Sequence, residues 1–228
     1  MFNMLKKSLF VLFFIIFGCS QSTYLDIPYH EQVGPSCVPA QVLMALDYYY
    51  PDSNYTLAQI DENVGRKDDK WVWFSQALPV LIDEGLDAYY YSASPYQNLT
   101  PEFTIRFYGE EDGTVINQVT DWVEFNRSRD YILASSRFYN KVLDWQTVED
   151  EFRKGSVILM IIDINIADKI EELPYSGHGI IITDIEKDTV TFHDSNGRPN
   201  LKIEKSHFIK AWNAPGTDND VIIIRGRL

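Results

Sequence analysis

Residues 32–41 run Gln32-Val33-Gly34-Pro35-Ser36-Cys37-Val38-Pro39-Ala40-Gln41, and they lead from a turn-rich loop into a stretch with helical apolar spacing. We predict a helix over residues 38–50, with Pro39 in its first turn, where the missing N–H costs little. A cysteine at a helix N-terminus lies near unpaired N–H groups and the positive end of the helix dipole, and both stabilise a thiolate. The pattern therefore predicts a reactive Cys37. The alternative is a small buried apolar residue.

The first residues have the pattern of an export signal. Lys6 and Lys7 precede an unbroken apolar run over residues 9–17, which is too short to span a bilayer comfortably, and Gly18 and Cys19 follow. This order resembles a bacterial lipoprotein signal, in which the cysteine is lipidated and becomes the new N-terminus. Phe17 departs from that pattern, because small residues are commoner there. An uncleaved membrane anchor and an ordinary secretory signal are the alternatives.

We accordingly expect a signal peptide over residues 1–18, a lipidated Cys19 with a short tether over 19–23, and one domain over 24–228. The product would be an exported cell-envelope lipoprotein, facing the periplasm or the exterior and attached to the bilayer through its lipid. Cys37 would then have no second thiol to pair with, because the chain contains two cysteines in all. The domain must be stable through its apolar core, for which its length is sufficient.

The charge of the chain excludes one class of partner. The formal net charge is −13, and removal of the two signal lysines would take it to −15. A nucleic-acid-binding protein needs a basic surface, so we expect no nucleic-acid partner. We expect a monomer.

The apolar spacing predicts helices before strands. We expect an extended segment at 25–29, helices over 56–64, 73–84, 145–153 and 206–212, and strands over 88–92, 156–163 and 221–224. Residues 179–183 and 189–193 flank a charged turn and predict an antiparallel hairpin. Residues 95–145 are the least informative: 107–113 has turn composition, and 115–125 and 131–142 have weak helical patterns. The fold class is α+β, with a helical N-terminal half, a C-terminal antiparallel sheet and a cleft between them.

A thiolate nucleophile needs a base, a group that orients the base, and donors for the oxyanion. His178 lies between two glycines at the start of the first hairpin strand, 141 residues after Cys37, a separation typical of papain-type enzymes. Asp194 closes the paired strand, so the hairpin would make it a neighbour of His178. Gln32 could add a side-chain amide to the Cys37 backbone N–H at the oxyanion. Taken singly, each of these residues has an ordinary explanation as a turn or loop residue.

The other histidines have weaker settings. His193 would face away from His178 if the strand alternates regularly, or would replace it in a slipped register. His30 and His207 are interpreted as surface residues. No pair of cysteines or histidines has zinc-ligand spacing, so we expect no metal and no organic cofactor.

Residues 25–46 and 156–199 resemble the papain-like cysteine peptidases that process bacteriocin leaders. They are more similar still to the stand-alone relatives called family C-thirty-nine-like. The matching positions are Gln32, Cys37-Val38-Pro39-Ala40, Gly177-His178 and Asp194. The resemblance implies a papain-like fold, with these residues as oxyanion donor, nucleophile, base and orienting group. Val38 departs from the family, which usually has glycine there, and a branched side chain could narrow the cleft.

We therefore expect a cysteine peptidase with a Cys37-His178-Asp194 triad and a peptide or protein substrate. A transpeptidase or acyltransferase on the same fold remains an alternative, because triad residues do not decide between water and an amine as acceptor. A non-catalytic binding lipoprotein is a further alternative, which Val38 keeps open. Double-glycine leaders, cell-wall peptides and host proteins are all compatible substrates.

Overall fold

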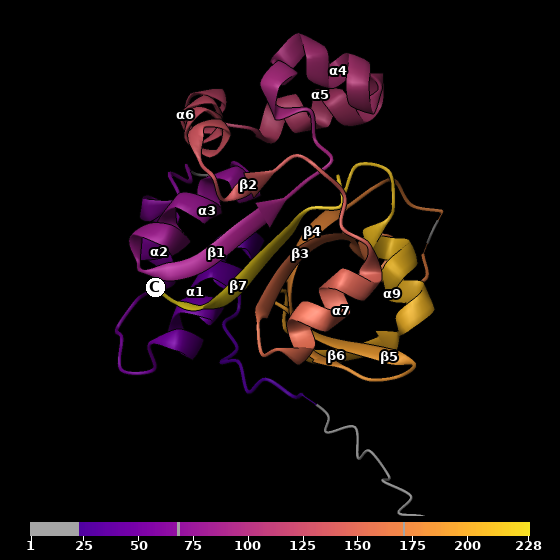
Figure 1. Ribbon diagram of the computed structural model, residues 1–228. Coiled ribbons are helices and arrows are strands. Elements are labelled where there is room, and N and C mark those ends of the chain that lie inside the picture. Colours follow the sequence, from indigo (N-terminus) through magenta and orange to yellow (C-terminus); the bar gives the residue numbers. More distant parts are fainter. Residues whose placement is uncertain (1–22, 68, 171) are drawn as a thin grey trace, which may run out of the picture.

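The computed structural model describes residues 23–67, 69–170 and 172–228 (Figure 1). The expectations about the signal peptide and Cys19 lie outside these residues. No helix in the described ranges is both long and apolar enough to cross a bilayer. The described helices are α1 (Cys37–Tyr49), α2 (Leu57–Asn63), α3 (Phe74–Asp83), α4 (Pro101–Tyr108), α5 (Glu110–Val119), α6 (Trp122–Ala134), α7 (Trp145–Arg153), α8 (Ile164–Ala167) and α9 (Lys205–Trp212).

One sheet runs through the part of the chain that the structure describes. Its strands are β1 (Leu86–Tyr91), β2 (Phe138–Tyr139), β3 (Val157–Asp163), β4 (Gly177–Ile185), β5 (Thr189–Asp194), β6 (Arg198–Glu204) and β7 (Val221–Arg227). Their spatial order is β2-β1-β7-β3-β4-β5-β6. Among the neighbouring strands of this sheet, β1 and β2 pair in parallel and the other pairs are antiparallel. The expected α+β class is confirmed, and the helical N-terminal half contributes β1 to the same sheet through its pairing with β7.

The apolar run that becomes β3 explains where the core lies. β3 pairs with β4 on one side and with β7 on the other, and its residues are buried apart from Ile161, which is half-buried. A continuous apolar run is what a strand covered on both faces requires. In Figure 1, α7 lies in front of the curved part of the sheet, whereas α1 lies behind β7. The first turns of α1 are buried all round and pack against β4.

The extended segment before Cys37 runs beside the hairpin of β4 and β5. The Leu25 N–H donates to the Thr183 carbonyl oxygen over 2.9 Å, and the Gln32 N–H donates to the Ser195 carbonyl oxygen over 2.9 Å. The buried imidazole of His193 bonds the Ile27 carbonyl oxygen through Nε2 at 2.9 Å. Its Nδ1 accepts the Asn200 N–H at 3.0 Å. Nε2 is therefore the protonated nitrogen, and both ring nitrogens are occupied by hydrogen bonds to the backbone.

The turn expected at 107–113 is wrong in extent. Helices α4 and α5 meet at Gly109, which alone forms the break with a φ of 93°. Gly113 lies inside α5 and does not end it. A side chain is excluded at this position, because a Cβ would come within 2.5 Å of the Ile105 Cα. The glycine that gives this segment its turn-like composition is thus required by close packing of two helices. These two helices and α6 form a group at the top of Figure 1.

The expectation of helices over 115–125 and 131–142 also needs correction. Residues 120 and 121 separate α5 from α6, with the Asp121 carboxylate capping α6 through the Val123 and Glu124 N–H groups. Helix α6 ends at Ala134, and Phe138 and Tyr139 form β2 beside β1. The Tyr139 ring stacks on Tyr91 at 5.1 Å, so tertiary aromatic packing decides the conformation here. Strand β6 was not expected, because its exposed edge carries mainly polar residues.

Candidate active site

Cys37 is the first residue of α1, and the preceding loop is fixed by its own hydrogen bonds. The Ser36 hydroxyl donates to the Val33 carbonyl oxygen at 2.9 Å and accepts the Val33 N–H at 3.0 Å. Ser36 is therefore occupied within the loop and does not cap the helix, and no other side chain does so. Helix starts leave N–H groups without partners. Those of Cys37 and Val38 are left beside the thiol.

The register of the hairpin brings His178 to Asp194. Asp194 lies opposite Ile180 in the β4–β5 ladder, and His178 lies two residues before Ile180. Side chains two residues apart share a face of a strand, so His178, Ile180 and Asp194 face the same way. His178 Nε2 and Asp194 Oδ1 are 2.6 Å apart. His193 is paired with Ile181 and faces the other side, so the slipped register is not what the structure has.

The Asp194 carboxylate is fully buried and held from three directions. Besides the imidazole, the Asn196 N–H donates to Oδ1 at 2.8 Å and the Arg198 Nε donates to Oδ2 at 2.6 Å. Burial opposes ionisation, but His178, Asn196 and Arg198 outweigh it and lower the pKa of Asp194 to about 2. Asp194 is thus a fixed anion behind the imidazole at any ordinary pH.

The thiol and the imidazole shift one another toward an ion pair. Burial raises the pKa of the Cys37 thiol, but interactions with His178 and with the N–H groups of Gly179 and Val38 outweigh it and bring the pKa below its usual value. Burial likewise opposes charge on His178, yet its bonds to Asp194 and Cys37 raise the pKa to about 10. Because Asp194 occupies Nε2, Nδ1 is the ring nitrogen left for the sulfur. The arrangement favours a thiolate beside an imidazolium.

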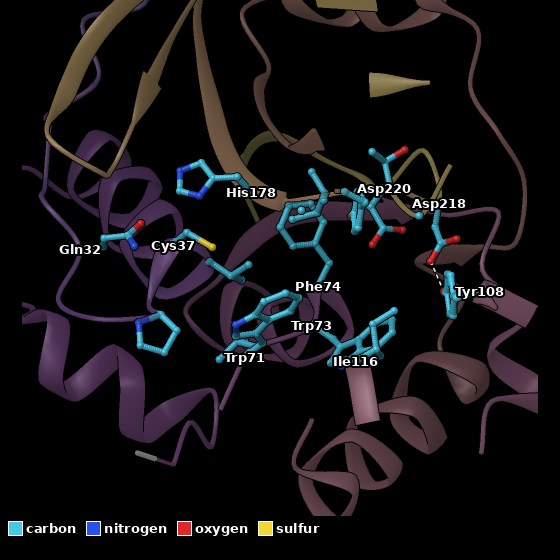
Figure 2. A pocket seen from close by; sticks show the side chains of 18 residues that line it. Gln32, Cys37, Trp71, Trp73, Phe74, Tyr108, Ile116, His178, Asp218 and Asp220 are labelled. Atoms are coloured by element: carbon cyan, nitrogen blue, oxygen red, sulfur yellow. Dashed lines mark hydrogen bonds between the residues drawn. The ribbon is translucent and has the colours of Figure 1, made fainter. Parts of the chain in front are cut away.

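Gln32 borders the same pocket as Cys37 and His178. Its Nε2 donates to the Gly34 carbonyl oxygen at 2.8 Å, and its Oε1 accepts the Ser195 hydroxyl at 2.8 Å. A primary amide has two N–H groups, so one remains for another acceptor. Figure 2 shows the Gln32 amide beside the thiol, with His178 above both.

The remaining expected residues lie as follows. Val38 is 2% exposed and lines the pocket next to Cys37. His30 is partly exposed and lies 2.7 Å from an Asp47 carboxylate oxygen. His207 is partly buried, with Nε2 2.6 Å from the Ile166 carbonyl oxygen. Neither of these two histidines borders the pocket. Among the described residues, no group of three or more metal-ligating side chains is gathered.

Gln41 and Gly179 are two residues that the sequence did not single out. Gln41 lies one turn after Cys37, is 1% exposed, and has no hydrogen-bond partner for either amide atom within the described structure. A Cβ at Gly179 would lie 1.8 Å from Gln41 Nε2 and 3.5 Å from Cys37 Sγ. Only glycine therefore lets β4 approach α1 so closely. The one sequence signal was a polar residue inside an otherwise apolar helix segment.

The pocket extends away from Cys37 into the N-terminal half and has a volume of about 240 Å³. Several aromatic rings line it, and two aspartates lie at the end opposite the thiol (Figure 2). These aspartates, Asp218 and Asp220, come from the segment between α9 and β7. Sequence analysis missed them, because nothing local distinguishes them from ordinary turn residues.

Comparison with known proteins places the chain in a family. Residues 24–219 match the profile described as Peptidase_C39 like family. The chain belongs to this C39-like peptidase family. Its fold is similar to that of a C39-like peptidase from Bacillus anthracis, with a TM-score of 0.50 and 11% identity over 91% of this chain and 99% of the other. Among curated proteins, no match was found.

The first prediction concerns the ionisation of the Cys37 thiol. We expect iodoacetamide to label Cys37 in the folded protein rapidly at pH 6, because the imidazolium stabilises the thiolate there. Asp194→Asn should lower the pKa of His178, weaken the stabilisation of the thiolate and so move the onset of labelling to higher pH. The measurement is the labelling rate between pH 4 and pH 11, followed by mass spectrometry. Labelling that begins only above pH 8 would contradict the ion pair.

A second prediction concerns the contact between β4 and α1. Gly179→Ala should destabilise the protein by about 1–3 kcal/mol, because the added methyl group overlaps the buried Gln41 amide, which must move to accommodate it. In a Gln41→Ala background the same substitution should cost less, and the four proteins can be compared by urea denaturation. Strictly additive effects would mean that Gly179 and Gln41 do not compete for the same space.

Proposed function

We propose that the protein is a cysteine peptidase in which Cys37 is the nucleophile, His178 the general base and acid, and Asp194 the group that orients the imidazole. The observation that carries this proposal is the placement of a partly buried thiol at an uncapped helix start, in one pocket with an imidazole held by a buried carboxylate. Such an arrangement supplies an activated nucleophile, a proton carrier and a fixed orientation.

The proposed reaction has two stages. The Cys37 thiolate attacks the carbonyl carbon of a peptide bond, and the resulting oxyanion accepts hydrogen bonds from the Cys37 N–H and the free amide N–H of Gln32. His178 donates its proton to the departing amine as the C–N bond breaks, which leaves an acyl-thioester on Cys37. Neutral His178 then takes a proton from water, the hydroxide attacks the thioester, and the carboxylic acid and the thiol are released.

The non-catalytic alternative depends on Val38. Its side chain is buried against the pocket wall, so it narrows the space next to Cys37 without occupying the helix N–H groups. We therefore propose that Val38 restricts which residue can lie beside the scissile bond. If an amine replaced water as the acceptor, the acyl group would be transferred to that amine. The products of a reaction run with a peptide and an added amine distinguish hydrolysis from acyl transfer.

The decisive experiment compares turnover of a fluorogenic peptide library by the unmodified protein and its variants. Cys37→Ala and His178→Ala should abolish turnover without unfolding the domain, and Asp194→Asn should leave residual activity. Gln32→Ala should lower kcat by about 10²–10³-fold if its amide supports the oxyanion. His30→Gln, a histidine outside the pocket, serves as the matched control. Turnover that survives Cys37→Ala would refute the proposal.

We also propose that the protein acts as a lipoprotein at the cell envelope. Support comes from the lysine pair, the apolar run over residues 9–17 and Gly18-Cys19. Cys19→Ser should abolish lipid attachment and release the protein from membranes, because nine apolar residues hold a bilayer poorly. Mass spectrometry of the mature N-terminus checks this. An unmodified Cys19 in membrane-bound protein would contradict it and would leave the peptidase proposal intact.

A further inference from the structure

The end of the pocket opposite Cys37 carries two carboxyl groups, Asp218 and Asp220. Both border the pocket that contains the thiol, and Figure 2 shows them on the far side of Phe74 and the tryptophans. Asp220 is 5% exposed, whereas Asp218 is half-buried. The pocket thus joins a nucleophile at one end to acidic groups at the other.

Neither aspartate has a cationic partner among the described residues. The Tyr108 hydroxyl donates to Asp218 Oδ2 at 2.5 Å, and the Tyr90 hydroxyl donates to Asp220 Oδ1 at 2.9 Å. The ion pairs of the described chain include neither carboxyl group. The pocket lining contains no lysine and no arginine. Buried carboxylates are ordinarily paired with a cation, and a bound ligand with a positive charge would supply the one that the described residues do not.

The electrostatics agree with that reading of the geometry. Burial raises the pKa of Asp218 to about 6, and burial together with Asp218 raises the pKa of Asp220 well above its usual value. A cation placed between the two carboxyl groups would favour their ionised forms and reverse these shifts. Binding of a cation would therefore relieve an energetic cost that the free protein carries.

The walls between the two ends suit a long apolar stem. Trp71, Trp73 and Phe74 border one side, and Tyr175 and Ile161 also line the space. Lysine and arginine side chains bury their methylene stems along apolar surfaces and keep the charged head in a polar setting. Aromatic rings also attract cations through their faces. The aromatic lining is an observation independent of the two acidic groups, and both fit the same class of side chain.

We propose that this pocket is a specificity subsite for a lysine or arginine side chain of the peptide substrate. The stem lies along the aromatic walls, and the cationic head binds Asp218 and Asp220. The inference rests on the proposed peptidase function, because it assigns the substrate class of the same site. An uncharged side chain of equal length would contact the aromatic walls but leave the two carboxyl groups without a cation.

A structural role is the alternative for the two aspartates, since they also bind Tyr108 and Tyr90. Asparagine substitutions separate the two roles, because an amide oxygen still accepts those hydroxyl groups but carries no charge. Asp218 has a φ of 53°, and asparagine tolerates such a backbone as well as aspartate does. Asp218→Asn and Asp220→Asn are therefore the appropriate variants. Asp52 is an exposed turn residue after the C-terminal end of α1. Asp52→Asn changes the net charge by the same amount as Asp218→Asn and serves as the control.

The experiment uses capped peptides in which one lysine is moved through successive positions, with norleucine at the same position in a matched set. For the unmodified protein, kcat/KM should favour lysine over norleucine at one position. Asp218→Asn should lower kcat/KM for that lysine peptide by about tenfold or more without lowering kcat/KM for the norleucine peptide. Asp52→Asn should change neither value. Equal losses on both peptides would show a structural role and overturn the proposal.

A binding measurement keeps this test separate from the test of catalysis. In the Cys37→Ala protein, the fluorescence of Trp71 and Trp73 should report tighter binding of the lysine peptide than of the norleucine peptide. Asp218→Asn should remove that difference. Selective binding without any turnover by the unmodified protein would refute the peptidase and retain the cationic subsite. Turnover with no preference for lysine or arginine would retain the peptidase and refute the cationic subsite. Uncapped versions of the same peptides are measured in parallel. A preference for the free amino terminus, with no lysine preference inside the chain, would also overturn the proposal.

Discussion

The contact between the first turns of α1 and strand β4 holds the candidate site together. Cys37 comes from the N-terminal half and His178 from the sheet, so neither half has a complete site alone. Gly179 permits the approach, because it is the neighbour of His178 and lies under both Gln41 and Cys37. A buried amide without partners is an unusual cost to carry in a core. Its position suggests that close packing at this point outweighs the loss of its hydrogen bonds.

A second constraint is that the hairpin fixes the imidazole before any substrate arrives. The register sets His178 and Asp194 on one face, and Arg198 and Asn196 hold the carboxylate from behind. His193, on the opposite face, holds the segment that leads to Cys37 through Nε2 and binds strand β6 through Nδ1. Because side chains alternate along β5, the adjacent residues His193 and Asp194 lie on opposite faces. Asp194 orients His178, and His193 binds the segment that leads to Cys37.

Features with a local physical cause could be predicted from the sequence. The start of α1, the buried strand β3, the β4–β5 hairpin and the Asp144 cap of α7 each follow from spacing, turn residues or capping chemistry. Residues 95–145 could not be read in this way. Gly113 looks like a helix breaker until α4 lies against it, and Phe138 and Tyr139 become a strand only beside β1. In the candidate site, Asp218 and Asp220 reach the pocket through the path of the chain between α9 and β7, which no local pattern specifies.

The position of β7 has a consequence for the order of events during biosynthesis. This last described strand lies between β1 and β3, so it joins the half that carries Cys37 to the half that carries His178. Until residues 221–227 have emerged from the ribosome, β1 and β3 have no strand to link them, and the sheet remains in two parts. The continuity of the sheet therefore depends on the last strand that the structure describes, whereas the contact between α1 and β4 is made without it.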